Sequence, residues 1–250
     1  MKAALVVNRV LPAVDANLAA ILNMANEAAD EGAELVVFPE AAVTGLVNND
    51  NPVHDLPLGQ TIPGPITEAL AELCRERRLW LAIGLLEREG GRLYDTAVLL
   101  TTDGEIGLKY RRIHPGWHGR RADESVYCRG TELMKTRTAI GTFAFLICGD
   151  LFDDGLVQRI RDLGPDWLLF PFARAFDDGS HSQGRWDREE KAQYQQRVKL
   201  VGVTTLMTNY LADERLDGDS SFGGAMVVSG DGFEIASFPL GKEGVLFVDL

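Results

Sequence analysis

The residue with the clearest potential for chemistry is Cys148, which ends an apolar run, 143–147, and is followed by Gly149 and Asp150. Such a run is typical of a buried strand. In α/β folds the reacting groups lie at the carboxyl ends of strands, and a cysteine placed there has the chemistry of a nucleophile. Most free cysteines, however, are small buried hydrophobes. Taken alone, the segment favours the structural role.

A carboxylate ends a second apolar segment in the same way. Leu35–Phe38 is followed by Pro39 and Glu40, and an alanine-rich stretch, 15–30, precedes it with apolar residues at helical spacing. Gly32 separates the two. The chain therefore begins as strand, helix, strand, with Glu40 at a strand's carboxyl end.

The rest of the chain continues this alternation and then repeats it. We expect two mixed β-sheets with helices outside, in one domain covering residues 1–250, since no linker or low-complexity tract interrupts the pattern. The further strands and helices that the patterns predict are strands at 3–7, 79–85, 93–101, 105–114, 167–171, 201–208, 225–229, 233–238 and 245–250, and helices at 66–78, 155–163 and 186–200.

Composition excludes several classes of protein. Hydrophobic residues make up 46% and charged residues 25% of the 250 positions, as in ordinary folded proteins. The net charge of -12 and the pI of about 4.8 argue against nucleic acid and membrane partners. No apolar run approaches the length of a membrane span. The three cysteines form no disulfide framework and suit a reducing compartment, so we expect a cytoplasmic protein.

Three segments together resemble the carbon–nitrogen hydrolase (nitrilase) superfamily. They are 38–45 around Glu40, 109–114 around Arg112, and 147–152 around Cys148. Between them, Leu93–Ala97 stands where the family has an Asn-Thr strand. Each motif alone is weak, but the resemblance runs in order along nearly the whole chain. It implies an αββα sandwich, in which two mixed β-sheets pack face to face with helices outside.

The resemblance also implies a catalytic set without a cofactor. Cys148 would be the nucleophile that attacks a carbonyl or nitrile carbon and forms a thioester-like intermediate. Glu40 would be the general base, and the cation would stabilise the developing negative charge. The family has lysine at that position, and here it is Arg112, which is longer, planar and always charged. Lys109 differs from it in strand parity and would point to the opposite face.

Other positions also depart from the family pattern or extend it. A second, supporting acid would be Asp123 or Glu124, and the alternative for each is a solvated loop acid. Arg197 and Asn209 keep a family spacing, while the usual Glu-Asn between them is Leu200-Val201. The side chains expected in the loops that form the substrate pocket are Trp117, His118, Phe172, Arg174 and Trp186, although packing or surface positions are equally consistent with the sequence.

We expect no metal, because His114 and His118 have no matching set of ligands. Family members associate as dimers through a further C-terminal segment. The chain stops at Leu250, soon after the last expected strand, which weakens the expectation of a homodimer.

These features predict a hydrolase of non-peptide C–N bonds, of the amidase or N-carbamoyl amidohydrolase type, acting on a small linear substrate. Nitrile hydrolysis is less expected, since that subgroup has longer chains. The alternative, raised by Arg112, is a pseudoenzyme that keeps the pocket as a small-molecule binding or regulatory module. An acyltransferase with the same three residues is a third interpretation, which nothing in the sequence demands.

Overall fold

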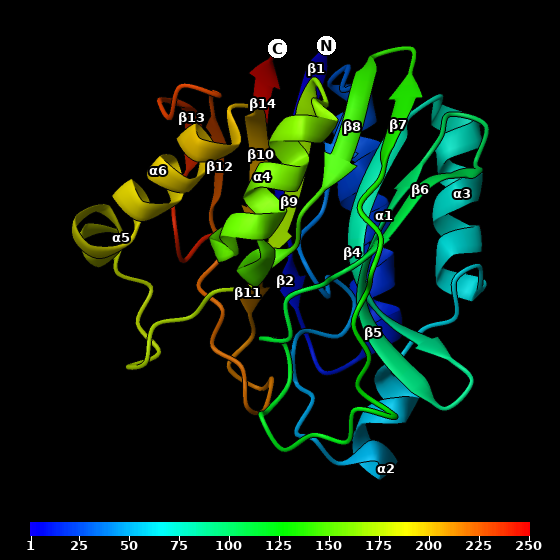
Figure 1. Cartoon of the computed structure of the whole chain (residues 1–250). Helices are drawn as coiled ribbons and strands as arrows, with labels where there is room; N and C mark the ends of the chain where they lie inside the picture. The colour runs from blue at the N-terminus through cyan, green and yellow to red at the C-terminus, as the bar shows by residue number, and fades with distance from the viewer.

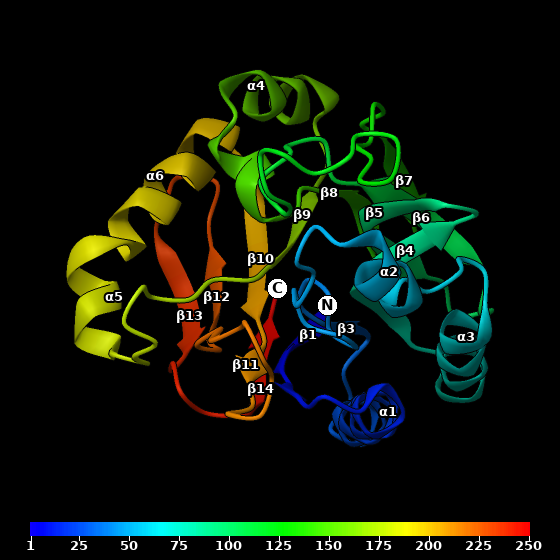
Figure 2. The same cartoon turned by 90° about the horizontal axis from the view of Figure 1, so that it is seen from below.

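In the computed structural model, which describes residues 1–250, two six-stranded sheets lie face to face with helices outside (Figures 1 and 2). This confirms the predicted αββα sandwich. The first sheet has the order β14 (Gly244–Asp249), β1 (Lys2–Val7), β3 (Leu35–Val37), β4 (Trp80–Glu89), β5 (Arg92–Leu100) and β6 (Ile106–Arg111). The second has the order β13 (Glu234–Phe238), β12 (Ala225–Val228), β10 (Thr204–Asn209), β9 (Trp167–Phe172), β8 (Gly141–Phe145) and β7 (Lys135–Thr138).

Each sheet is parallel at its centre and antiparallel toward its edges. β1, β3 and β4 are parallel, as are β8, β9 and β10, because a helical segment connects successive strands of each set. The helices on the first sheet are α1 (Val14–Asp30) and α3 (Pro65–Arg77); those on the second are α4 (Asp154–Leu163), α5 (Gln183–Glu189) and α6 (Lys191–Val201) (Figure 2). Parallel strands end at the same edge, which brings Glu40 after β3 and Cys148 after β8 to the carboxyl ends of their sheets.

Strand β1 shows how the layers are formed. Leu5 and Val7 belong to the core between the sheets, whereas Ala4 and Val6 pack with Ile21 of α1 on the outer face of the first sheet. All are fully buried. Alternate side chains of a strand point to opposite faces, so an apolar strand with no polar face must be covered on both sides.

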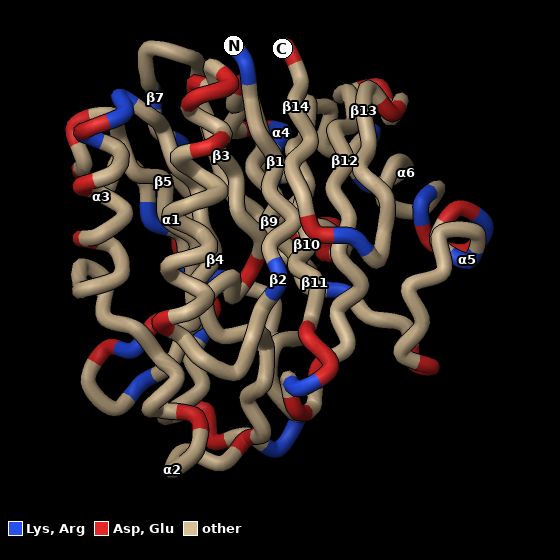
Figure 3. Tube along the Cα trace, turned by 180° about the vertical axis from the view of Figure 1, so that it is seen from behind, with Lys and Arg blue, Asp and Glu red and all other residues tan.

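The two ends of the chain lie side by side (Figure 3), because β14 pairs antiparallel with β1 from Lys2↔Asp249 to Val7↔Gly244. None of the helices has the length and apolar composition of a membrane span.

Several local predictions were wrong. The helix expected at 186–200 is two helices, α5 and α6, interrupted at Glu190, and Val201 ends α6 instead of beginning β10. The strand expected over 105–114 ends at Arg111. Short elements without a strong hydrophobic period escaped prediction: α2 (Pro52–Asp55), a 3₁₀ turn at Leu56–Leu58, β7, and the pair β2 (Arg9–Val10) and β11 (Leu211–Ala212).

Candidate active site

Cys148 begins a 3₁₀ helix, Cys148–Phe152, directly after the segment that leaves β8. Its φ of 45° lies in the left-handed region, which a non-glycine residue adopts rarely and which is frequent at strained turns that present a nucleophile. The side chain is half-buried, and Sγ lies 3.5 Å from the carbonyl oxygen of Ala173. The thiol is therefore held at a sharp strand-to-helix turn, with partial access to solvent.

Asp150 fixes this turn against the segment that follows β6. Its carboxylate accepts hydrogen bonds from the backbone N–H groups of Ile147 at 3.0 Å and His114 at 2.7 Å, and from the hydroxyl of Tyr110 at 2.7 Å. Gly149 lies at the same place, where an added Cβ would be 2.6 Å from Nδ1 of His114 and 2.7 Å from Nη2 of Arg112. The turn that bears the cysteine and the segment that bears the arginine thus pack directly on each other.

Glu40 and Arg112 form a fully buried ion pair. Arg112 Nη1 donates to Glu40 Oε1 at 2.7 Å and also to Asp95 Oδ2 at 3.1 Å, and the exposed fractions of Arg112, Glu40 and Asp95 are 2%, 0% and 1%. Arg112 Nη2 makes no hydrogen bond within the protein and faces Gly149. The structure therefore brings the predicted acid and cation into contact, and it leaves Nη2 and the buried Nε of Arg112 without an acceptor.

The electrostatics of this cluster are dominated by burial. Burial raises the pKa of Glu40 well above its ordinary value, the charges of Asp95 and Cys148 raise it further, and Arg112 acts in the opposite direction. Burial also works against the charged form of Arg112, but the charges of Cys148, Glu40 and Asp95 outweigh it and hold the pKa of Arg112 above its usual range. Glu40 is thus a carboxyl that takes up a proton readily while Arg112 stays cationic.

The two acids proposed as supporting residues lie elsewhere. Asp123 and Glu124 are exposed, and the Asp123 carboxylate accepts from the Ser125 hydroxyl at 2.7 Å. Neither makes a hydrogen bond or ion pair with Glu40, Arg112 or Cys148. The second carboxylate in contact with the arginine is Asp95 of β5, to which sequence reasoning assigned no role.

The predicted pocket residues fall into two groups. Phe172 and Arg174 flank Ala173, whose carbonyl contacts the Cys148 thiol, and Arg174 is paired with Glu190 at 2.9 Å. Trp186 is buried and packs at 5.1 Å between ring centroids on Tyr194, an aromatic residue of α6 that sequence reasoning did not select. The charge of Cys148 acts on the pKa of Tyr194, which burial raises. Phe172 packs on the same tyrosine, with 5.6 Å between ring centroids.

Trp117 and His118 belong to a different neighbourhood. Trp117 is buried with Leu86, Leu93 and Tyr127 in a small apolar cluster, and its ring meets that of His118 edge-on at 4.9 Å. They border a cavity of 260 Å³ whose other wall includes Leu46 and Asp50. This cavity lies between the segments that follow Glu40 and Arg112 in the chain.

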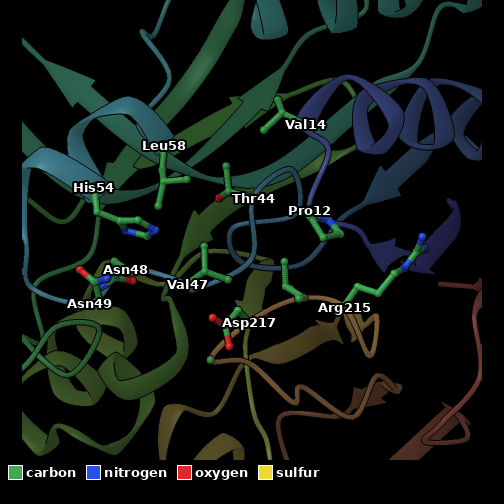
Figure 4. A pocket seen from close by; sticks show the side chains of 12 residues that line it. Pro12, Val14, Thr44, Val47, Asn48, Asn49, His54, Leu58, Arg215 and Asp217 are labelled. Carbon is green, nitrogen blue, oxygen red and sulfur yellow. The ribbon is translucent and has the colours of Figure 1, made fainter.

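A larger cavity of 520 Å³ lies beside the segment that follows Glu40 (Figure 4). His54, Thr44 and Asn48 line it together with residues of the loop after β11. None of Glu40, Arg112 and Cys148 lines it.

Two more residues hold the site together. Asn209, fully buried at the end of β10, donates from Nδ2 to the carbonyl oxygen of Arg174 at 2.9 Å and accepts from the Arg174 N–H at 3.3 Å, which fixes the loop that bears Ala173. Arg197 of α6 donates from Nε to the carbonyl oxygen of Leu151 at 2.8 Å in the turn after Cys148. These are the two residues whose spacing resembled the family pattern. No cluster of three or more metal-ligating side chains is present.

Lys109 lies away from the site, as strand parity predicts. Its Nζ donates to Glu87 at 2.7 Å, on the face where Arg111 also binds Glu87 at 2.7 Å. The cation that faces Glu40 is therefore Arg112 and not the neighbouring lysine.

Two known proteins are similar to this chain in sequence. An aliphatic nitrilase from Sinorhizobium fredii (strain HH103) is 30% identical over 260 residues, covering 95% of this chain and 82% of that protein. A formamidase from Bacillus cereus (strain Q1) is 38% identical over 86 residues, only 34% of this chain and 25% of that protein.

Two solved structures share the fold at lower identity. A carbon–nitrogen hydrolase from Helicobacter pylori G27 has a TM-score of 0.85 at 20% identity, covering 99% of this chain and 87% of that one. An amidase from Nesterenkonia sp. has a TM-score of 0.81 at 21% identity, covering 100% and 90%. The sequence pattern of the carbon-nitrogen hydrolase family matches residues 2–250 of this chain. With that match along the chain, the two-sheet sandwich and the strand-end cysteine, the protein belongs to the carbon–nitrogen hydrolase family, within the nitrilase superfamily.

Proposed function

We propose that this hydrolase cleaves the C–N bond of small linear amides or N-carbamoyl compounds, with Cys148 as nucleophile. The observation that carries the proposal is the buried Glu40–Arg112 pair, joined at 2.7 Å, against the turn that presents Cys148. A fully buried acid whose pKa is raised, in part by the charge of Cys148, can serve as the base that activates this half-buried thiol.

Glu40 and Arg112 divide the chemistry between them. Glu40 takes the proton of the Cys148 thiol as Sγ attacks the carbonyl carbon, and the C–N bond breaks as Glu40 returns that proton to the leaving nitrogen. The free Nη2 of Arg112 faces Gly149, beside the nucleophile, and donates to the oxygen on which negative charge develops. Glu40 then removes a proton from a water molecule, which attacks the carbonyl carbon of the thioester. The C–S bond breaks, the carboxylic acid product leaves, and Glu40 returns the proton to Sγ of Cys148.

Neighbouring enzymes support the amide class. For the amidase from Nesterenkonia sp. AN1, structures carry the acetamide moiety of fluoroacetamide added to the active-site cysteine, and a variant binds butyramide. The amides that these structures hold indicate which compounds to test first. A nucleophilic thiol needs reducing conditions, and we propose the cytoplasm as its location.

The first test is the reactivity of the three thiols toward iodoacetamide near neutral pH. Cys148 should be alkylated fastest, Cys128 is a matched half-buried control, and Cys74 should be slowest because burial raises its pKa to about 12. Peptide mass spectrometry follows each site separately. Equally slow alkylation of all three thiols would contradict a catalytic cysteine and favour the alternative of a binding module.

The second test is ammonia release from short aliphatic amides, ω-amides and N-carbamoyl compounds. We expect turnover of at least one class, and Cys148→Ala should reduce it by about a thousandfold or more. Activity that survives this substitution would rule out the thioester route.

A further inference from the structure

Asp95 is a buried carboxylate that shares the active-site guanidinium with Glu40. Its Oδ2 accepts from Arg112 Nη1 at 3.1 Å, and its backbone carbonyl accepts from the Arg112 N–H at 2.8 Å. The residue lies on β5, whose register with β6 places Thr96 opposite Arg111 and so brings Asp95 beside Arg112. Both the backbone and the side chain of Asp95 thus accept hydrogen bonds from Arg112.

The three groups do not balance in charge when both acids are ionised. One guanidinium then faces two carboxylates, all of them at most 2% exposed. The remaining oxygens, Asp95 Oδ1 and Glu40 Oε2, have no hydrogen-bond partner. Unpaired charge is unfavourable at such depth, so the cluster is most stable with one ion pair and one protonated acid.

We propose that Asp95 is the positioning residue that balances the permanent charge of Arg112, so that Glu40 remains free to take up and release a proton. If Glu40 were the only anion on an arginine, which cannot be deprotonated in proteins, no second carboxylate would oppose the pull of the guanidinium on its pKa, and Glu40 would be a weaker base. A weak base draws the thiol proton poorly. The inference rests on the proposed hydrolase and concerns how its base is kept basic.

The other charged or titratable groups around the cluster come from several elements. Asp150 and His114 interact electrostatically with Arg112, Arg174 interacts with Cys148, and Tyr194 of α6 interacts with both Cys148 and Glu40. Tyr110 is bonded to Asp150, and Glu190 is paired with Arg174. Substitution of Asp95 leaves all of these in place, so a change in the pH dependence would come from Asp95.

The decisive variant is Asp95→Asn, which keeps an acceptor for Arg112 and removes the charge. We expect the acidic limb of kcat/KM against pH to move to lower pH, because loss of a like charge lowers the pKa of Glu40. The alkaline plateau should fall by about tenfold as Glu40 becomes a weaker base. The pH profile of Cys148 alkylation by iodoacetamide should move in the same direction, and this reaction does not depend on turnover.

The matched control is Glu87→Gln. Glu87 is an equally buried acid of the same sheet, paired with Lys109 and Arg111 on the opposite face. This variant should lose stability without moving either pH profile. Comparison of the two variants therefore distinguishes a general loss of stability from a shift of the pH profiles that is specific to Asp95.

A double-mutant cycle gives a second measure. A buried lysine can give up its proton, whereas arginine cannot, so Arg112→Lys should impair the wild-type site but partly restore activity in the Asp95→Asn background. If Asp95→Asn alone does not fold, the effect of Asp95 is measured between Arg112→Lys and the double variant. Restored folding in the double variant would itself support the charge balance.

Two outcomes separate the failure of this inference from that of the function. If Cys148 alkylates rapidly and amides turn over, but Asp95→Asn leaves both pH profiles in place and shows no coupling with Arg112→Lys, Asp95 is only structural. If wild type neither hydrolyses amides nor alkylates preferentially at Cys148, the proposed function fails. A shift of the alkylation profile would then still report the influence of Asp95 on the site.

Discussion

Glu40 is a carboxyl group enclosed by protein on all sides, and its surroundings act against its ionisation. Arg112 offers it one hydrogen bond, while Asp95 and Cys148 add negative charge nearby. Active sites commonly sacrifice stability for such reactive groups. At the scale of single residues, replacing this acid should therefore lower the activity and raise the stability of the protein.

Glu40→Gln tests that separation. Activity should fall by about 10²- to 10⁴-fold, since the amide cannot accept the thiol proton. Below the unfolded-state pKa of glutamate, about 4.3, both the folded and unfolded states hold the proton, so the wild type and the variant should be equally stable. As pH rises toward the raised pKa of folded Glu40, the wild type should lose stability relative to the variant.

The measurement is urea unfolding of both proteins between pH 4 and pH 8. We expect the variant to be more stable at pH 8 by about 0.5–2 kcal/mol, with the difference shrinking toward pH 4. A variant that is less stable than the wild type at pH 8 would mean that the Glu40–Arg112 pair is net stabilising, contrary to this view.

At the scale of elements, the site depends on close packing where strands end. Gly84 of β4 lies against the turn at Glu40: its N–H donates to the Pro39 carbonyl at 2.9 Å, and its carbonyl accepts from Ala42 at 3.0 Å. A Cβ at Gly84 would lie 2.5 Å from the Cα of Glu40. The absence of a side chain here lets the backbone that bears the acid lie directly on the sheet.

Gly84→Ala should therefore displace Glu40 from Arg112. We expect a stability loss of about 1–3 kcal/mol from overpacking. A displacement near 1 Å should also reduce kcat/KM by about a hundredfold.

The control is Gly91→Ala in the β4–β5 hairpin, where an added Cβ meets nothing within 4 Å. Thermal unfolding and steady-state kinetics of the two variants compare the positions directly. Equal activity of the two would show that the turn at Glu40 tolerates displacement.

At the scale of the whole molecule, the site exists only where the two sheets meet. Glu40, Asp95 and Arg112 come from the first sheet and Cys148 from the second, and the core between the sheets includes residues of both. Because β14 returns to pair with β1, the C-terminal strand also completes the first sheet. Neither half could bury its inner face without the other, which is consistent with the prediction of one domain over residues 1–250.

That prediction has a direct test in thermal unfolding. The four tryptophans are spread over both halves, with Trp80 on β4 and Trp167 on β9. Far-ultraviolet circular dichroism and tryptophan fluorescence should therefore report one coincident transition. Two separated transitions would show that the sheets unfold independently and would contradict the single domain.

The homodimer stays a prediction as well. The molar mass of a 27.4 kDa chain in solution, measured by light scattering, distinguishes the monomer from the dimer. Apolar side chains that remain exposed, such as Phe233 and Phe152, are the first positions to substitute if the mass is doubled.

The sequence by itself determined the order of elements, the two-sheet sandwich, and the three segments that bear Glu40, Arg112 and Cys148. The elements follow from apolar periodicity and strand ends, and the three segments from their resemblance, in order, to the motifs of the family. The alternation of side chains along a strand also correctly predicted that Lys109 and Arg112 point to opposite faces. The boundaries near Glu190 and Arg111 were missed because helix breaks and strand ends depend on packing as much as on periodicity.

Only the tertiary structure decided which side chains surround the cation. Asp95 is 17 positions from Arg112 in the chain but touches it through the register of β5 and β6, whereas Asp123 and Glu124, closer in sequence, are turned to solvent. Only the tertiary structure shows that Arg112 is buried against two acids, with Nη2 facing Gly149 next to the cysteine. Contacts between strands depend on register and on which face is covered, and these are properties of the assembled sheets rather than of any one segment.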